Sequence, residues 1–369
     1  MGVLGAAVIG LGVGRSHCEG YATHPKCRLV AVSDLIEERL SWAREKYGVE
    51  THKDYNEILA RDDVDVVSVC TPDFTHVRLA AEALEADQYV LVEKPMALKL
   101  EDCDAMIRAA EKSGRMLSVD HCLRVSPLFS TIKALIDDGT LGDMAGLGIY
   151  HWRGSFLIKP GRWIQKRRYA GSMTLQKMCH SVDLAQWFGG ELSEVYAVGK
   201  SVRKDFDYEQ TVYINTKFKD GAIGLIAHTI LGFPGRWTLW IIGSKASVYS
   251  ESGRTSKGPI SELRIKEHKE DLVEDHEYDK IVRDVDSKEF REMDVIAEYT
   301  RRYVDCILED RKPPVLGQDG KKVVEICLAS DLSIHEGKTI ALPLGETPKS
   351  IAKTIARPDY RYLDEPGST

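Results

Sequence analysis

A glycine-rich turn directly after an apolar run constrains the fold of this chain more than any other feature. The run Leu4–Ile9 is followed by Gly10-Leu11-Gly12-Val13-Gly14. Gly10 permits a tight turn after a strand, and Gly12 lets the backbone approach a phosphate at the amino end of the next helix. Similar apolar runs recur, separated by segments of helical period, at Leu29–Ser33, Val64–Cys70, Tyr89–Val92 and Met116–Val119. This alternation predicts a doubly wound parallel α/β sheet that is buried on both faces.

The pattern changes after Arg124. Apolar residues alternate on both sides of Lys219-Asp220-Gly221, which predicts a β-hairpin with an Asp-Gly turn. The other elements expected in this part are helices over Val125–Gly142, Met173–Phe188, Met293–Leu308 and Gly320–His335, strands over Leu147–Trp152, Thr238–Ile242 and Ala246–Tyr249, and strands with long loops over 251–294. Strands in series favour a largely antiparallel or mixed sheet.

The length of 369 residues exceeds one typical core. We therefore expect a first domain over residues 1–122, a second over 123–342 and a C-terminal tail over 343–369.

The composition excludes several classes of protein. A net charge of −7 without a basic block argues against a nucleic-acid partner. No apolar run is long enough for a membrane span, and the first strand begins too early to leave room for a signal peptide. The eight cysteines form no Cys-x-x-Cys pair and no Cys/His cluster at zinc spacing. We expect reduced thiols, no metal and a cytoplasmic location.

Asp34 strengthens the interpretation of the glycine turn as a dinucleotide site. It ends the second apolar run, twenty residues after Gly14. A carboxylate at this place accepts hydrogen bonds from the ribose hydroxyls and repels a 2′-phosphate. The next basic residue is Arg39, so the sequence favours NAD over NADP. The alternative is that Asp34 caps the helix that begins near Glu37.

Arg15 stands where a third glycine is usual, because Gly14 comes one place early. Its side chain could pair with the pyrophosphate or lie in solvent on the helix. Thr71-Pro72 ends the third run and His76 follows it, at the sheet edge where a nicotinamide would lie. Thr71-Pro72 could equally serve only to end the strand, without a role at the cofactor.

Lys94 lies in Glu93-Lys94-Pro95, at the end of the fourth run and at the same expected edge. An ammonium there would stabilise developing alkoxide charge on a bound alcohol. A second candidate is His180, with Gln176 and Lys177 one helical turn before it and Asp183 nearly one turn after it. A neutral imidazole can take up a hydroxyl proton near neutral pH. The alternatives are an exposed strand-end lysine and a packed helix histidine held by Asp183.

These residues together resemble the Gfo/Idh/MocA family, named for glucose–fructose oxidoreductase, inositol dehydrogenase and rhizopine catabolism. The resemblance covers most of the chain, and the Glu-Lys-Pro motif with the later His-x-x-Asp is more specific than the glycine turn. The matching segments are Ala7–Gly12, Asp34, Cys70-Thr71-Pro72 with His76, Glu93-Lys94-Pro95, Arg124, Gly142, Gly171 through Asp183, and Trp187 with Gly189-Gly190.

The resemblance implies an N-terminal Rossmann domain and a C-terminal α/β domain built on a large, open, mostly antiparallel sheet. It implies association into dimers or tetramers through that sheet, and a Lys94-Pro95 peptide that is cis. The family lysine maps onto Lys94 and its histidine onto His180. Two positions depart from the family pattern: Gln176 replaces an aspartate that is usual four residues before the histidine, and Met178 replaces a glycine. Gln176 can hold a hydroxyl but cannot carry a proton away, so Lys177 is expected to supply the missing polar contact.

The expected site residues fall into three groups. The cofactor-binding residues are Gly10, Gly12, Val13, Gly14, Arg15, Asp34, Thr71, Pro72, His76, Glu93 and Lys94. The catalytic residues are Lys94, His180, Gln176 and Lys177. The residues expected to contact substrate are Asp120, His121, Arg124, Trp152, Arg162, Trp163 and Asp183. The basic stretch Lys166-Arg167-Arg168 could close over an acidic sugar, but a solvated loop is favoured.

The sequence therefore predicts an NAD-linked oxidoreductase that transfers hydride between a nicotinamide and a secondary alcohol or ketone of a sugar, sugar derivative or cyclitol. One alternative is an enzyme that retains NAD and cleaves glycosides by transient oxidation of the sugar. Another is a non-catalytic, cofactor-responsive regulatory protein. The retention of both Lys94 and His180 argues against the last, because a sensor needs neither.

Overall fold

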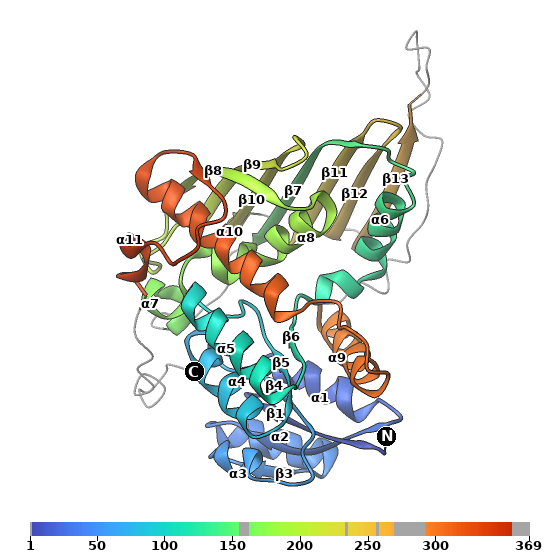
Figure 1. Ribbon diagram of the computed structural model, residues 1–369, viewed down its shortest axis with the longest axis vertical. Helices are drawn as coiled ribbons and strands as arrows, with labels where there is room; N and C mark the ends of the chain where they lie inside the picture. Colours follow the sequence, from blue (N-terminus) through green and yellow to red (C-terminus); the bar gives the residue numbers. More distant parts are fainter. Residues whose placement is uncertain (1, 155–161, 233–234, 256–257, 269–291, 356–369) are drawn as a thin grey trace. The chain divides into compact units, whose positions relative to one another are not determined.

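The computed structural model describes residues 2–154, 162–232, 235–255, 258–268 and 292–355 (Figure 1). The described residues form two compact units. The first unit comprises residues 2–125 and 292–324, and the second comprises the described residues from 126 to 268 and residues 325–355. None of the helices in the described ranges combines the length and the apolarity that a membrane span requires.

The first unit contains a parallel sheet, as predicted, and the sheet has six strands. Its strand order is β3-β2-β1-β4-β5-β6. The strands are β1 (Leu4–Ile9), β2 (Cys27–Ser33), β3 (Glu50–His52), β4 (Val66–Val69), β5 (Tyr89–Val92) and β6 (Leu117–Val119). Every residue of β1 and β4 is buried, which explains why these strands read as continuous apolar runs. The sequence analysis missed β3, because this short edge strand carries polar, partly exposed residues.

Helices connect these strands. They are α1 (Gly14–Ala22), α2 (Glu37–Tyr47), α3 (Asn56–Leu59), α4 (His76–Glu85) and α5 (Leu100–Ser113), with 3₁₀ turns η1 (Asp73–Thr75) and η2 (Cys122–Val125). The later helix α9 (Glu292–Leu308) packs against α1 in the same unit. A Cβ on Gly20 of α1 would lie 2.6 Å from the Cβ of Thr300 of α9, so only glycine allows this approach. Tyr303 of α9 donates to the carbonyl oxygens of Val90 and Met116.

This arrangement differs from the division expected from the sequence. A second domain that runs unbroken from residue 123 to 342 would include α9, yet α9 belongs to the first unit. The helix α10 (Gly317–Glu336) begins in the first unit and ends in the second. The reason is tertiary packing, because α9 packs mainly against α1, which lies much earlier in the chain.

The second unit is built on an eight-stranded sheet with the order β13-β12-β11-β7-β10-β9-β8-β14. Only β7 and β10 pair in parallel, so the prediction of a mostly antiparallel sheet is confirmed. Its strands are β7 (Met144–Gly154), β8 (Leu192–Lys200), β9 (Thr211–Phe218), β10 (Ile223–Gly232), β11 (Arg236–Gly243), β12 (Ala246–Thr255), β13 (Gly258–Glu267) and β14 (Ile340–Ala341). The predicted hairpin is β9–β10, and the part of the expected 251–294 segment at 269–291 lies outside the described residues.

The helices of this unit are α6 (Pro127–Asp137), α7 (Arg167–Ala170), the π-helix η4 (Thr174–Met178), α8 (Cys179–Gly189) and α11 (Lys349–Ala352), with the 3₁₀ turn η3 (Trp163–Gln165). α6 begins later than expected, because η2 occupies residues 122–125 and Pro127 suits the first turn of a helix. α8 contacts β7 and β10 on one face of the sheet. We call this the inner face; it carries Leu147, Ile149, Leu239 and Ile241, all of them buried.

Candidate active site

The glycine turn has the geometry that a dinucleotide requires. Gly10 has a φ of +94°, and a Cβ there would lie 2.5 Å from the carbonyl oxygen of Cys70. A Cβ on Gly12 would meet no protein atom within 4 Å, so open space lies above this residue. The first residue of α1 is Gly14, and α1 lacks a side-chain cap on its amino end. Open space next to uncapped backbone amides fits a pyrophosphate.

Gly14 has the packing role of the third glycine, although it lies one place before the usual position. A Cβ at Gly14 would lie 2.8 Å from Cγ1 of Val8 and 3.1 Å from the Cβ of Cys70. Gly14 therefore allows the close helix–sheet packing that the third glycine provides in such turns. Val13, at the N-cap position, is half-buried. Arg15 is exposed, and its guanidinium stacks 4.6 Å from the centre of the Trp42 ring.

Asp34 links the glycine turn to the next helix. Its Oδ2 accepts a hydrogen bond of 2.7 Å from the backbone N–H of Leu11, and its Oδ1 accepts one of 2.9 Å from Ile36. Nη1 of Arg39 lies 3.2 Å from Oδ2. The N-cap residue of α2 is Ile36, so the alternative that Asp34 is the helix cap is wrong. The carboxylate lies at the carboxyl end of β2, next to the glycine turn, where a ribose would be bound.

His76 lies behind the strand ends. It is fully buried, and its two ring nitrogens lie 2.9 Å from the carbonyl oxygens of Thr71 and Pro95. Burial lowers the pKa of His76. The histidine thus connects the end of β4 with the Lys94-Pro95 peptide, which is cis as expected. Thr71 bonds to the hydroxyl of Thr75, and Thr71 and Pro72 are both half-buried.

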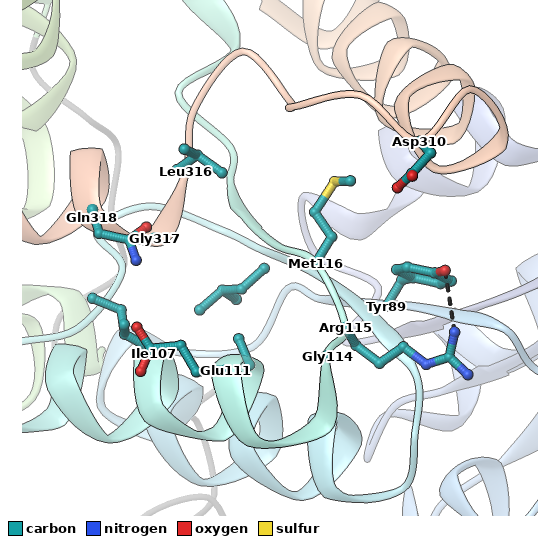
Figure 2. Close-up of a pocket in the computed structure, with 12 residues that line it drawn as sticks. Tyr89, Ile107, Glu111, Gly114, Arg115, Met116, Asp310, Leu316, Gly317 and Gln318 are labelled. Atoms are coloured by element: carbon teal, nitrogen blue, oxygen red, sulfur yellow. Dashed lines mark hydrogen bonds between the residues drawn. The ribbon is translucent and has the colours of Figure 1, made fainter.

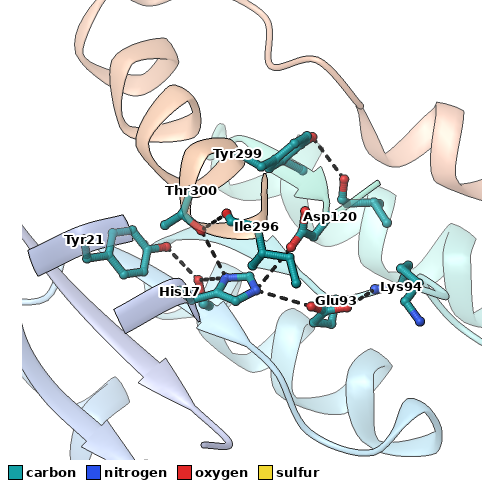
Figure 3. A network of polar contacts seen from close by, with 11 residues as sticks. His17, Tyr21, Glu93, Lys94, Asp120, Ile296, Tyr299 and Thr300 are labelled. Atoms are coloured by element: carbon teal, nitrogen blue, oxygen red, sulfur yellow. Dashed lines mark hydrogen bonds and ion pairs between the residues drawn. The ribbon is translucent and has the colours of Figure 1, made fainter. Parts of the chain in front are cut away.

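Lys94 follows β5 directly and is half-buried, at the same sheet edge as Gly12 and Asp34. Its backbone N–H donates to Oε2 of Glu93 at 3.0 Å. Oε1 of Glu93 faces inward and lies 3.4 Å from Nε2 of His17 (Figure 3). The Glu93 carboxylate therefore faces the protein interior, and its predicted contact with the cofactor is not supported by this geometry.

Asp120 was expected at the substrate, but the structure places it in the interior. It is 1% exposed, and its Oδ2 lies 3.2 Å from Nε2 of His17 (Figure 3). His121 is equally buried. Arg124 donates from Nη1 to the carbonyl oxygen of Pro314 at 3.0 Å, which ties η2 to the segment after α9. The strand-end position alone did not reveal these inward orientations, because successive side chains at a strand end alternate in direction.

The sequence analysis missed His17 entirely. One signal was present: Gly14 packs on the sheet, and His17 lies three residues later on the same helix face. A histidine on that face must be buried and must find polar partners.

In the second unit, a π-helix precedes His180. The segment Thr174–Met178 is wound as η4, and α8 begins at Cys179. The wider winding changes the angular offset that regular helical spacing predicts between Gln176 and His180. Thr174 anchors η4 by donating to Oδ1 of the buried Asp331 at 2.7 Å. Burial raises the pKa of Asp331 to about 6.

Buried polar side chains gather in this part of the second unit. His180 is 8% exposed, Gln176 4% and Asp183 1%, and Lys177 is half-buried. Polar atoms in such places are suited to hold hydroxyl groups of a small molecule.

Two further histidines lie on the inner face of the sheet. His151 of β7 is in register with His228 of β10 and with Trp237 of β11. The ring of His151 stacks on Trp237 with centroids 3.8 Å apart, and its centroid lies 4.4 Å from that of His228. Burial, with the nearby charges of Arg153 and Lys177, lowers the pKa of both histidines well below 6.5. Among the residues that the structure describes, neither nitrogen of His228 has a hydrogen-bond partner.

Trp152 lies on the opposite face of the sheet from His151 and is 43% exposed. Adjacent strand residues point to opposite faces, so both cannot line one site on the inner face. This geometry does not support the expected substrate contact of Trp152. Arg162 and Trp163 begin η3, where Oε1 of Gln165 accepts the backbone N–H of Arg162 at 3.2 Å.

The basic stretch after η3 is a short helix, α7, rather than a loop. Arg167 pairs with Glu209 at 2.6 Å, and the guanidinium of Arg168 lies 4.8 Å from the centre of the Tyr169 ring.

A pocket of about 310 Å³ lies elsewhere on the first unit (Figure 2). Tyr89, at the start of β5, and Leu117, at the start of β6, line it together with α5 and the segment before α10. It therefore opens at the amino ends of these strands, opposite to the edge with Lys94. Ligands of doubly wound folds bind at the carboxyl ends, so this pocket is not the cofactor site.

His17, Glu93 and Asp120 are the one group of described side chains close enough together to share a metal ion. The imidazole nitrogen faces both carboxylates at ion-pair distance, so His17 already acts as their common partner. We therefore assign no metal to this group.

Comparison with known proteins agrees with these observations. A family model described as "Oxidoreductase family, NAD-binding Rossmann fold" matches residues 4–121, and one described as "GFO/IDH/MocA C-terminal domain" matches residues 129–249. A myo-inositol 2-dehydrogenase from Thermotoga maritima is 28% identical over 346 residues, which are 91% of this chain and 97% of that protein. An NAD⁺-dependent scyllo-inositol 2-dehydrogenase from Bacillus subtilis is 24% identical over 348 residues, 91% and 95% of the two chains.

Solved structures share the fold. The crystal structure of a probable dehydrogenase from Thermotoga maritima has a TM-score of 0.76 at 25% identity, and covers 92% of this chain and 99% of that one. The WlbA dehydrogenase from Bordetella pertussis, solved in complex with NADH and UDP-GlcNAcA, has a TM-score of 0.78 at 24% identity, with 93% and 99% covered. With both family models matched in order along the chain, and with the glycine turn, Asp34 and the cis Lys94-Pro95 peptide in place, this protein belongs to the Gfo/Idh/MocA family of NAD-binding oxidoreductases.

Proposed function

We propose that this protein is an NAD-dependent dehydrogenase of a secondary alcohol on a polyhydroxylated small molecule, a sugar, sugar derivative or cyclitol. The observation that carries the proposal is the position of Lys94 at the sheet edge that also holds the Gly12 turn and Asp34. A lysine at this edge would lie beside the reactive end of a bound dinucleotide. The similarity to two inositol dehydrogenases over nine-tenths of the chain supports the substrate class.

Bound NAD would supply the hydride acceptor. The residues of the chain would handle the proton and the charge on oxygen. In the direction of oxidation, the carbinol C–H bond breaks as hydride leaves, and His180 takes up the hydroxyl proton as the carbonyl forms. The Lys94 ammonium stabilises the developing charge on that oxygen.

Other polar groups of the second unit would hold the remaining hydroxyls. Gln176 and Lys177 are proposed to position a neighbouring hydroxyl, and Asp183 to contact the substrate. His151 and His228, on the inner sheet face, add neutral imidazoles that can both donate and accept hydrogen bonds. An amphoteric surface of this kind suits a polyol better than it suits a simple alcohol.

The decisive experiment replaces the two proposed catalytic side chains. We expect Lys94→Ala and His180→Ala each to lower kcat by about 10²-fold or more, since acid–base catalysis contributes about 10²–10⁴. Turnover is followed by NADH absorbance with inositols and sugars at saturating NAD. Lys99→Ala and His335→Ala, the second of which alters an exposed residue on α10, are matched controls and should keep wild-type rates.

Near-normal rates in both catalytic variants would refute the assigned roles. Cleavage of a glycoside without net NADH would instead identify the NAD-retaining alternative.

We also propose that the chain forms a dimer or tetramer through the face of the second sheet opposite to α8, called the outer face below. Large apolar residues of this face are exposed: Trp152, Tyr196, Val198, Tyr213, Ile223, Ile242 and Tyr249. Apolar patches of this extent on a sheet are typical of protein–protein contacts. The eight cysteines, all of them free and buried, support the proposal of a reducing, cytoplasmic environment.

A further inference from the structure

His17 lies at the centre of a buried charged cluster in the first unit (Figure 3). The side chain projects from α1 and is 0% exposed. Its Nε2 faces two carboxylates at once, Oε1 of Glu93 at 3.4 Å and Oδ2 of Asp120 at 3.2 Å. Its Nδ1 lies 3.0 Å from Oγ of Ser68, which the Tyr21 hydroxyl contacts at 2.7 Å.

The burial of two carboxylates is favourable only if the histidine between them carries a positive charge. Glu93 is 5% exposed and Asp120 1%, so their charges have almost no access to water. The ion pair of Oδ2 with Nε2 of His17, at 3.2 Å, compensates the charge of Asp120. A buried carboxylate without a cation would be strongly unfavourable.

The titration behaviour agrees with a charged ring. Burial acts to lower the pKa of His17, but its hydrogen bonds with Asp120 and Glu93 act to raise it, and the pKa lies well above 6.5. Burial, together with the charge of Glu93, raises the pKa of Asp120 to about 6. Burial also acts to raise the pKa of Glu93, yet His17 and Lys94 lower it on balance. Near pH 7 the cluster therefore carries one positive and two negative charges.

The other groups that face His17 are neutral. Burial raises the pKa of Tyr21 and of the Cys70 thiol, so both stay protonated. From α9, the hydroxyl of Thr300 lies 3.5 Å from Nδ1. His76 acts on Glu93, but burial lowers its pKa and keeps it uncharged. The remaining charged neighbour is Lys94.

The cluster is connected to Lys94 in two ways. Oε2 of Glu93 accepts the backbone N–H of Lys94 at 3.0 Å, so the orientation of the carboxylate also orients the start of the Lys94-Pro95 segment. The Lys94 charge acts on both Glu93 and Asp120. The ammonium thus experiences the net charge of the cluster behind it.

We propose that His17 is a positioning residue for Lys94: its imidazolium offsets one of the two carboxylates and holds Glu93 against the Lys94 backbone. Lys94 then faces one net negative charge, and its ammonium is left to act on substrate. Without the imidazolium, two carboxylates would draw the ammonium inward. This inference rests on the proposed function, in which Lys94 stabilises charge on the substrate oxygen.

The test is a charge-compensation cycle. His17→Gln keeps a polar side chain of similar length and leaves two carboxylates, whereas His17→Gln combined with Asp120→Asn returns the cluster to one net negative charge. We expect H17Q to lower kcat by about tenfold, with the KM for NAD within about twofold, and the double variant to recover most of that loss. If the H17Q protein does not fold, recovery of folding in the double variant is the equivalent result. If kcat of the double variant is lower than that of H17Q, the proposal is wrong.

A second readout needs no turnover. In NMR spectra of the wild-type protein labelled with ¹⁵N-histidine, the His17 ring should be doubly protonated at pH 7.5, and elemental analysis should find no stoichiometric metal. A neutral ring, or one metal ion per chain, would overturn the proposal. A wild-type protein that oxidises no polyol would refute the proposed function instead, while the NMR result would still decide the charge state of His17.

Discussion

At the scale of single residues, Asp34 shows how one carboxylate serves both the fold and the cofactor. It accepts backbone hydrogen bonds from the glycine turn and from the start of α2, and it pairs with Arg39. The same charge that organises the turn would repel a 2′-phosphate. Without the Asp34 carboxylate, Arg39 would be available to pair with a 2′-phosphate.

Replacement of Asp34 should therefore change the choice of cofactor. We expect Asp34→Ala to lower kcat/KM with NAD by about tenfold or more, because a hydrogen bond to a charged group contributes roughly 1.5–3 kcal/mol. The ratio of NADP to NAD activity should rise, since Arg39 is released. Steady-state kinetics with both cofactors measure this ratio. Arg39→Ala is the matched control, in which the preference for NAD should persist; an unchanged ratio in D34A would contradict the role of Asp34.

His17 should also leave a signature in the pH dependence of stability. Its folded-state pKa lies above the unfolded value of 6.5, so its contribution to stability is complete below that pH and is lost as the pH rises through the folded pKa. Asp120 acts in the same direction at lower pH, because it holds its proton up to about pH 6 in the folded state.

We expect the wild-type advantage over H17Q in free energy of unfolding to shrink between pH 6.5 and 9, by at most about 1.4 kcal/mol per pH unit for one proton. Urea denaturation of both proteins at several pH values measures the difference. A difference that stays constant or grows with pH would show that the ring is neutral in the folded protein.

At the scale of elements, the turn between β1 and α1 contains two glycines with different roles. Gly12 leaves space for the ligand, and Gly14 allows the helix to pack on the sheet. A Cβ at Gly12 would meet only open space, whereas one at Gly14 would press on Val8 and Cys70. The sequence shows two similar glycines, and the contacts distinguish them.

This difference predicts opposite effects of the same substitution. Gly12→Ala should leave the Tm within about 2 °C of wild type but weaken NAD binding by about tenfold or more, because a methyl group would occupy the space next to the pyrophosphate. Gly14→Ala should lower the free energy of unfolding by about 1–3 kcal/mol, the usual effect of overpacking. Thermal unfolding and calorimetric titration with NAD measure both quantities. Equal loss of stability in the two variants would contradict the assignment.

The π-helix η4 and the strand β7 show where element-level prediction fails. Periodicity predicted a single helix over Met173–Phe188, but five residues of it are wound more widely. No residue type marks such a turn; the anchor from Thr174 to Asp331 is visible only in the fold. In β7 the expected substrate contact of Trp152 ignored strand alternation, which places Trp152 on the face opposite to His151.

At the scale of the whole molecule, the outer face of the second sheet carries seven of the ten exposed large apolar side chains among the described residues. Val198 and Tyr213 are cross-strand neighbours on this face and are 46% and 43% exposed. A sheet face of this composition would be covered by a second copy of the chain in the proposed assembly.

A charge at this position should break the assembly. We expect Tyr213→Lys to shift the protein to a smaller species in light scattering coupled to size exclusion, since a buried lysine without a partner is strongly unfavourable. Val3→Lys, at an exposed residue of the first unit, should leave the assembly intact. A wild-type protein that is monomeric at micromolar concentration would refute assembly through this face.

The sequence by itself determined the local chemistry of this protein: which runs form buried strands, where the glycine turn lies, and that Asp34 and Lys94 follow strands of one parallel sheet. Each of these depends on residues that are neighbours in the chain, where periodicity and turn chemistry act directly. Only the tertiary structure decided that α9 packs with the first unit, that Asp120 turns inward to His17, and that His151 and His228 share one sheet face. Those outcomes depend on contacts between residues far apart in the sequence, whose energies come from burial and charge pairing in the finished fold and leave no periodic trace in the chain.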